Sequence, residues 1–124
     1  MEFRRRNAHP NGCLIPCERI RSWQSYPARP LSLTGASRGT GRSSALAFAR
    51  EEAQVLSHYG RGKAEAEAVV AEIRSAGGSA EAVGADLAVP DGAHTLARQV
   101  GPLVGDRLDS LIANAGVSKA ATIE

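Results

Sequence analysis

A glycine-rich turn between an apolar stretch and a helical stretch constrains this chain most. Residues 34–41 read TGASRGTG, with Gly35, Gly39 and Gly41 directly before the helix. We expect Gly35 to permit the sharp turn, Gly39 to let an anion approach the backbone, and Gly41 to let the helix pack against the sheet. Helix-start amides favour phosphate, so the turn predicts a pyrophosphate site. A purely structural turn is the alternative, but the strand-to-helix context favours the nucleotide.

Short apolar stretches alternate with amphipathic ones after this turn. We predict strands at residues 31–34, 53–58, 80–85 and 108–113, and helices at 41–52, 63–76 and 90–100. Pro90 is expected at the first turn of the last helix, where a missing N–H does no harm. Such alternation predicts parallel strands with right-handed helical crossovers, and hence an α/β, doubly wound sheet.

The helices carry apolar residues at the spacing that buries one face. The inward-facing residues are predicted to be Ala45, Leu46, Phe48 and Ala49 in the first helix, Ala66, Val69, Val70 and Ile73 in the second, and Leu96, Ala97 and Val100 in the third.

Residues 1–29 differ from the rest of the chain. They hold six arginines against two glutamates, a net charge of +4 in a chain of net charge +2, and show neither helical nor strand periodicity. We interpret 1–29 as a basic, disordered extension and 30–124 as the folded domain.

Composition argues against several classes of protein. The folded part has a net charge of −2, so we expect no nucleic-acid partner, and no apolar run is long enough to cross a membrane. Cys13 and Cys17, with only His9 nearby, do not supply a zinc ligand set, so no metal is expected. A disulfide between the two cysteines is the alternative, but nothing indicates a secreted protein, and we expect two free thiols in a cytoplasmic one.

Three motifs resemble one known family. TGASRGTG is similar to the T-G-x-x-x-G-x-G turn of the short-chain dehydrogenase/reductase family, GADLA at 84–88 to its aspartate turn after the third strand, and ANAG at 113–116 to its N-N-A-G signature. The order and separations match, and the likeness covers about 31–124. The resemblance implies a Rossmann-type sheet, here of about four strands in the order 3-2-1-4, and a nicotinamide cofactor.

The resemblance also implies roles for individual residues. Ser37, Arg38 and Thr40 would lie with the glycines at the phosphate turn. Asp86 would accept a hydrogen bond from the adenine amino group, beside the Leu87 backbone. Three residues after the fourth strand would pass under the adenosine ribose and hold that strand against the first. They are Asn114, Ala115 and Gly116. Singly, Asp86 could instead just end a strand, and residues 114–116 could be a plain turn.

The end of the second strand decides between NAD and NADP, because an acid there repels a 2′-phosphate. That position is Tyr59, followed by Arg61 and Lys63, with Arg38 facing the same pocket from the glycine turn. Arginine suits phosphate because its planar fork donates paired hydrogen bonds. We therefore predict NADP in preference to NAD; the alternative is that Arg61 and Lys63 belong to a solvated loop.

Tyr59 and Lys63 have the Tyr-x-x-x-Lys spacing of the family's catalytic pair, but we predict no catalytic role for them. That pair lies on a helix, where i and i+4 share a face. Gly60 and Gly62 disfavour a helix here. The family's catalytic serine and helical Tyr-x-x-x-Lys follow the Asn-Ala-Gly turn, and no residue of this chain matches them.

Some residues depart from the family pattern. Pro30 cannot donate to a strand ladder, Ser32, Ser57 and Ser110 place hydroxyls in strands that are usually apolar, and Glu52 stands where the family commonly has glycine. The leading interpretation is the cofactor-binding portion of an NADP-dependent oxidoreductase, inactive alone. A non-catalytic nucleotide-binding module and an inert truncated product are the alternatives.

Overall fold

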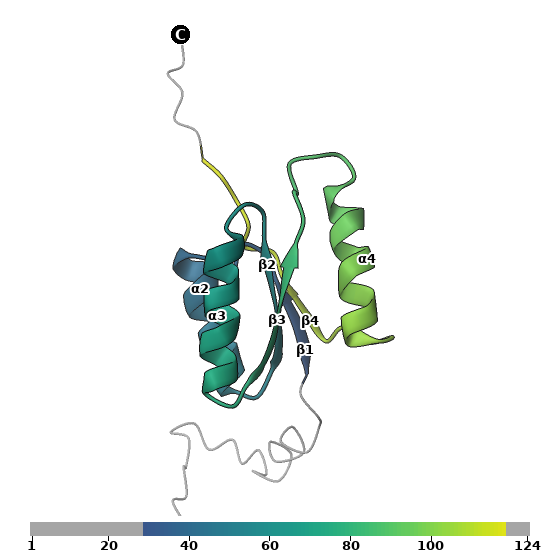
Figure 1. The fold of residues 1–124 in the computed structure, drawn as a ribbon. Helices are drawn as coiled ribbons and strands as arrows, with labels where there is room; N and C mark the ends of the chain where they lie inside the picture. Colours follow the sequence, from purple (N-terminus) through teal and green to yellow (C-terminus); the bar gives the residue numbers. More distant parts are fainter. Residues whose placement is uncertain (1–28, 119–124) are drawn as a thin grey trace, which may run out of the picture.

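The computed structural model describes residues 29–118 and shows a parallel sheet between two layers of helix (Figure 1). The predictions for Cys13, Cys17 and the basic extension concern residues that lie, apart from Arg29, outside this range. The elements are β1 (Pro30–Leu33), α2 (Gly39–Arg50), β2 (Gln54–Tyr59), α3 (Lys63–Ser75), β3 (Ser79–Gly84), α4 (Gly92–Val104) and β4 (Ser110–Ile112).

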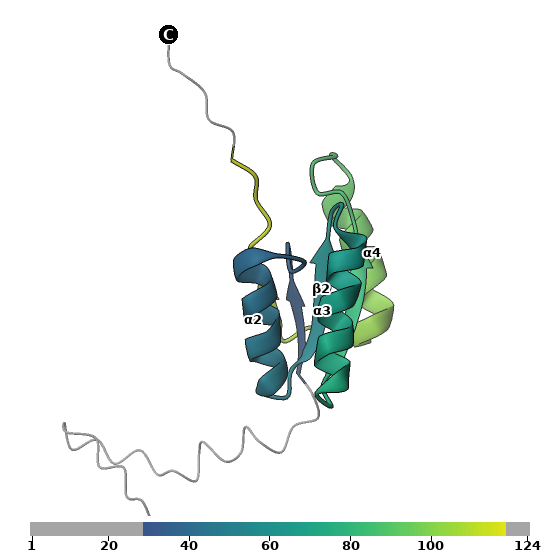
Figure 2. The same cartoon turned by 60° about the vertical axis from the view of Figure 1, so that its left-hand side comes forward.

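The strand order is β3-β2-β1-β4 and every neighbouring pair is parallel, which confirms the predicted topology. Helices α2 and α3 cover one face of the sheet and α4 lies on the other (Figures 1 and 2). The loops that follow β2 and β3 lie at the upper end of the sheet in Figure 1. In this topology the carboxyl ends of all four strands meet at one edge, which is where α/β sheets bind ligands.

Each face of the sheet has its own apolar cluster. The larger cluster joins β1, β2 and β3 to α2 and α3 and includes Val69, Val70 and Ile73 of the predicted α3 stripe. The fourth residue of that stripe, Ala66, is also fully buried. The smaller one joins Leu56 and Val83 to α4. Alternate side chains of a strand point to opposite faces, so β2 supplies both clusters. The 3.6-residue periodicity of α3 therefore predicted its buried face correctly.

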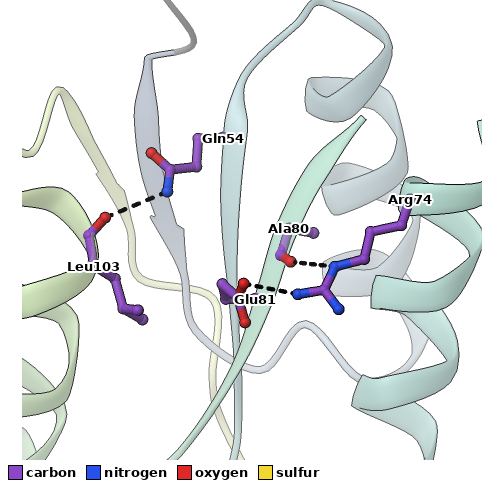
Figure 3. Close-up of polar contacts among 5 residues, drawn as sticks. All are labelled: Gln54, Arg74, Ala80, Glu81 and Leu103. Atoms are coloured by element: carbon purple, nitrogen blue, oxygen red, sulfur yellow. Dashed lines mark hydrogen bonds and ion pairs between the residues drawn. The ribbon is translucent and has the colours of Figure 1, made fainter. Parts of the chain in front are cut away.

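Polar contacts tie the helices to the sheet at the edge away from those loops. The Gln54 side-chain amide at the start of β2 donates to the Leu103 carbonyl of α4 at 3.3 Å (Figure 3). Arg74 of α3 donates to the Ala80 carbonyl at 3.0 Å and to the Glu81 carboxylate at 2.7 Å (Figure 3). These hydrogen bonds attach α4 to β2, and α3 to β3.

Helix α4 differs from its prediction at both ends. It begins at Gly92 rather than Pro90, after a turn in which the Gly92 N–H donates to the Val89 carbonyl at 3.0 Å. It runs past Pro102 to Val104, which packs on the smaller cluster. The prediction that Ala97 faces inward was wrong: Ala97 is exposed.

The ends of the other predicted elements are offset by one or two residues, except that α3 begins at the predicted residue, Lys63. Helix α2, for example, ends at Arg50, and Glu52 follows with φ of 64°. This left-handed conformation suits glycine and strains a glutamate. The departure from the family pattern at Glu52 therefore has a physical cost.

Candidate dinucleotide site

A cleft of about 860 Å³ opens at the carboxyl ends of the strands. Its volume lies in the range of roughly 300–1,000 Å³ that is typical of small-molecule and cofactor sites. Eleven of the fourteen predicted cofactor residues line it: Gly35, Ser37, Arg38, Thr40, Gly41, Arg61, Asp86, Leu87, Asn114, Ala115 and Gly116. The sheet topology thus gathers four separate sequence segments into one site.

The three glycines of the turn meet different surroundings. Gly35 has φ of 66°, and a Cβ there would lie 2.8 Å from the Ala115 Cα. At Gly41 a Cβ would clash with the Gly35 carbonyl and lie 2.7 Å from the Asn114 Nδ2. Gly39 has φ of 56° but only open space around it. Gly35 and Gly41 are therefore required for packing, whereas Gly39 leaves room for a ligand.

Helix α2 presents its amino-terminal end to the cleft. Arg38 is the N-cap residue, and its side chain makes no capping hydrogen bond. The first amides of a helix have no intrahelical acceptor, and the helix dipole favours an anion beside them. The turn can therefore bind a phosphate group through backbone N–H groups.

Thr34 joins the glycine turn to the segment after β4. Its hydroxyl accepts hydrogen bonds from the Asn114 and Ala115 backbone N–H groups, each at 2.9 Å. The Asn114 side-chain amide donates to the Thr34 carbonyl at 3.1 Å and to the Gly35 carbonyl at 3.3 Å. These contacts hold the end of β4 against β1, as expected for Asn114. Thr34 itself was missed as their acceptor.

Asp86 and Leu87 form the wall of the cleft beyond β3. The Asp86 carboxylate accepts a hydrogen bond from the Ala88 backbone N–H at 2.9 Å, which orders this turn. Among the residues that line the cleft, the charged side chains are Arg38, Arg61 and Asp86, besides the titratable His58. The lining therefore carries two fixed positive charges against one negative charge, which suits a phosphorylated ligand.

The three other predicted residues lie outside the lining. The Tyr59 ring packs over Gly84, and the Lys63 ammonium lies 3.8 Å from the Glu67 carboxylate on α3. Gly39 sits between two lining residues. Tyr59 ends β2 and Lys63 begins α3, so they share no helix. The geometry gives Tyr59 no lysine partner of the catalytic kind.

His58 is a lining residue that sequence reasoning missed. It is 2% exposed and contacts the turns that follow β1 and β3. The signal in the sequence was a lone histidine near the end of a strand that otherwise reads as buried. No local motif marks its role, because its partners Gly35 and Ala85 lie on the turns that follow two other strands.

Comparison with known proteins agrees with this geometry. The short chain dehydrogenase family model matches residues 31–124, which is most of the chain. The chain belongs to the short-chain dehydrogenase/reductase family. It is an oxidoreductase family, and the Rossmann-type sheet described above is its fold.

Individual relatives share about the same segment. An uncharacterized oxidoreductase of Methylorubrum extorquens is 44% identical over 92 residues, covering 74% of this chain and 37% of that protein. A 3-oxoacyl-[acyl-carrier-protein] reductase of Staphylococcus aureus is 41% identical over 87 residues, covering 70% and 35%. The chain therefore spans about a third of the length of these relatives.

A solved structure shows the likeness in three dimensions. The short chain dehydrogenase of Burkholderia cenocepacia in complex with NADP superimposes with a TM-score of 0.71 at 35% identity, over 77% of this chain and 38% of that one. That member of the family thus binds NADP with the same fold.

Within residues 29–118 no helix is long and apolar enough to span a membrane. The same residues contain no cluster of three or more histidine, cysteine or acidic side chains that could hold a metal ion.

Proposed function

We propose that residues 30–124 form the NADP-binding part of a short-chain dehydrogenase/reductase. The observation that carries this proposal is the composition of the cleft beyond β2. Arg38 and Arg61 line it from two different turns, and no acid stands at the end of β2. In a full-length enzyme of this family, NADPH would supply a hydride to a carbonyl, or NADP⁺ would accept one from an alcohol.

The residues present fit the cofactor. The amides at the start of α2 would bind the pyrophosphate, and the open space at Gly39 would admit it. Arg38 and Arg61 would hold the 2′-phosphate, and Asp86 would receive the adenine amino group. Residues 114–116 would pass under the adenosine ribose. NAD would bind more weakly, because it lacks the phosphate that the arginines neutralise.

We assign no catalytic residue within this chain. Its single Tyr-x-x-x-Lys sequence is Tyr59 to Lys63, whose side chains lie outside the cleft lining. The purified 124 residues are therefore expected to bind NADPH without oxidising it. Measurable NADPH oxidation with any member of a carbonyl panel would overturn this part of the proposal.

The cofactor assignment is tested by titration calorimetry with NADP and with NAD. The variant Arg38→Ala/Arg61→Ala should lose at least tenfold in NADP affinity, because charge-assisted hydrogen bonds contribute about 1.5–3 kcal/mol each, while NAD affinity should change little. Arg50→Ala, at the opposite end of α2, is the control for loss of positive charge. Unchanged NADP affinity in the double variant would sink the assignment.

One observation favours a second candidate, a nucleotide-binding module without catalysis that pairs with another chain. β4 is an outer strand of the described sheet, and Leu111 in it is 64% exposed. An open strand edge is a surface for pairing. Co-purification of one defined partner, lost in Leu111→Lys but retained in Leu103→Lys, would support it. A cofactor-binding chain that sediments as a monomer and yields no such partner would count against it.

A further inference from the structure

His58 lies at the carboxyl end of β2, between the turns that follow β1 and β3. Its Nδ1 accepts a hydrogen bond from the Gly35 backbone N–H at 3.2 Å, and its Nε2 lies 2.8 Å from the Ala85 carbonyl oxygen. The His58 carbonyl accepts a further hydrogen bond from the Ala36 N–H at 2.9 Å. The buried side chain of His58 thus contacts both turns, and its backbone carbonyl makes a second contact with the glycine turn.

These contacts fix the state of the ring. A carbonyl oxygen can only accept, so Nε2 must carry a proton to bond with Ala85. A backbone N–H can only donate, so Nδ1 must present a lone pair to Gly35. Both hydrogen bonds exist together only in the neutral ring with its proton on Nε2.

The two groups that His58 joins belong to opposite ends of the proposed adenosine site. Gly35 begins the turn that would bind the pyrophosphate, and Ala85 directly precedes Asp86. The ring therefore spans from the phosphate side to the adenine side across the floor of the cleft. Neither bond could be replaced by water without displacing a buried side chain, because His58 is only 2% exposed.

We infer that His58 is a positioning residue that holds the glycine turn and the aspartate turn at the separation that a dinucleotide requires. The inference rests on the proposed cofactor function. His58 does this as a bridge, by accepting from Gly35 and donating to Ala85. It follows that His58 occupies the N–H groups of both Gly35 and Ala36, and that the amides after Ala36 bind the phosphate.

Two conservative variants separate the halves of this bridge. In His58→Asn, the side-chain oxygen can stand near the place of Nδ1 and accept from Gly35. In His58→Gln, the side-chain nitrogen can stand near the place of Nε2 and donate to Ala85. His58→Leu removes both bonds. All three can be checked for folding by circular dichroism, and the Asn and Gln pair suffices if the leucine variant does not fold.

The first readout does not depend on any cofactor. Nitrogen-15 spectra of the parent chain at neutral pH should show His58 neutral and protonated on Nε2. Hydrogen exchange at the Gly35 amide should be slow in the parent chain and in His58→Asn, and at least tenfold faster in His58→Gln. A proton on Nδ1, or equal Gly35 exchange in the two variants, would overturn the bridge.

The second readout is NADP affinity by calorimetry. His58→Asn should stay within about threefold of the parent chain, and His58→Gln should bind about tenfold more weakly, because the glycine turn loses its acceptor. If the parent chain binds NADP and the two variants bind it with equal affinity, the positioning role is overturned. A parent chain that binds no dinucleotide refutes the proposed function instead, and Gly35 exchange then decides the bridge.

Discussion

The Asn114 side-chain amide donates to the Thr34 carbonyl oxygen at 3.1 Å, and the Asn114 backbone N–H donates to the Thr34 hydroxyl at 2.9 Å. These two residues lie 80 positions apart in the sequence. Thr34 directly precedes the glycine turn, and Asn114 follows the last described strand. Their mutual contacts therefore determine how closely the two sides of the proposed cofactor site approach each other.

The Thr34 hydroxyl should be necessary for stability. Thr34→Val keeps the shape of the side chain but leaves the Asn114 and Ala115 N–H groups without their acceptor, which should lower the free energy of unfolding by about 1–3 kcal/mol. Thr34→Ser keeps the hydroxyl and is the matched control. Urea unfolding followed by circular dichroism measures both. Equal losses in the two variants would show that the hydrogen bonds contribute nothing.

Glu52 should be a site at which glycine stabilises the fold. Its φ of 64° costs a glutamate about 1 kcal/mol, which glycine avoids. Glu52→Gly should raise the free energy of unfolding by about that amount. Glu51→Gly removes the same charge at φ of −90°, where glycine has no advantage, and should lower stability. The account of Glu52 is contradicted if both variants shift stability in the same direction.

Ser57 is the second position at which stability can be gained. It is fully buried in β2, and its hydroxyl has no hydrogen-bond partner. Ser57→Ala removes this unsatisfied group and should raise the free energy of unfolding by about 1 kcal/mol. Ser110→Ala removes an exposed strand hydroxyl and should have almost no effect. A destabilised Ser57→Ala protein would mean that the hydroxyl is satisfied.

Gly39 should matter for the ligand more than for the fold. Gly39 and Gly77 both have positive φ, 56° and 87°, and both have open space where a Cβ would lie. Alanine at either position should cost about 1 kcal/mol of stability. Only Gly39→Ala places a methyl group at the phosphate turn, and it should weaken NADP binding at least tenfold. Equal NADP affinities of the two variants would remove Gly39 from the site.

The sheet topology could be predicted from the sequence, because alternating strands and helices allow few arrangements of a parallel sheet. The buried face of α3 could also be predicted, since four apolar residues fall on one side of that helix. The start of α4 could not be predicted from the sequence, because Pro90 fits a first helical turn but here lies in the turn that the Gly92 N–H closes on the Val89 carbonyl. Ala97 was misassigned because alanine alone gives little information about which face is buried.

The candidate site, like the fold, was predictable from the sequence only in part. Local motifs predicted the backbone turns at Gly35 and Asp86, since each depends on its own few residues. The direction of the Tyr59 ring depends on which face of β2 it occupies and on the space above Gly84, neither of which a motif contains. His58 was missed for a similar reason, because its partners Gly35 and Ala85 are brought to it by two other strands.

The central claim is that the cleft at the carboxyl ends of the strands binds NADP. It is tested most directly by titrating NADP into the nitrogen-15-labelled chain and following the backbone amide signals. The account predicts saturable shifts at Gly39, Gly41, Arg61 and Asp86, with Gly77 unmoved at the opposite edge of the sheet. Amide signals that do not move at saturating NADP, or that move only outside the cleft, would contradict it.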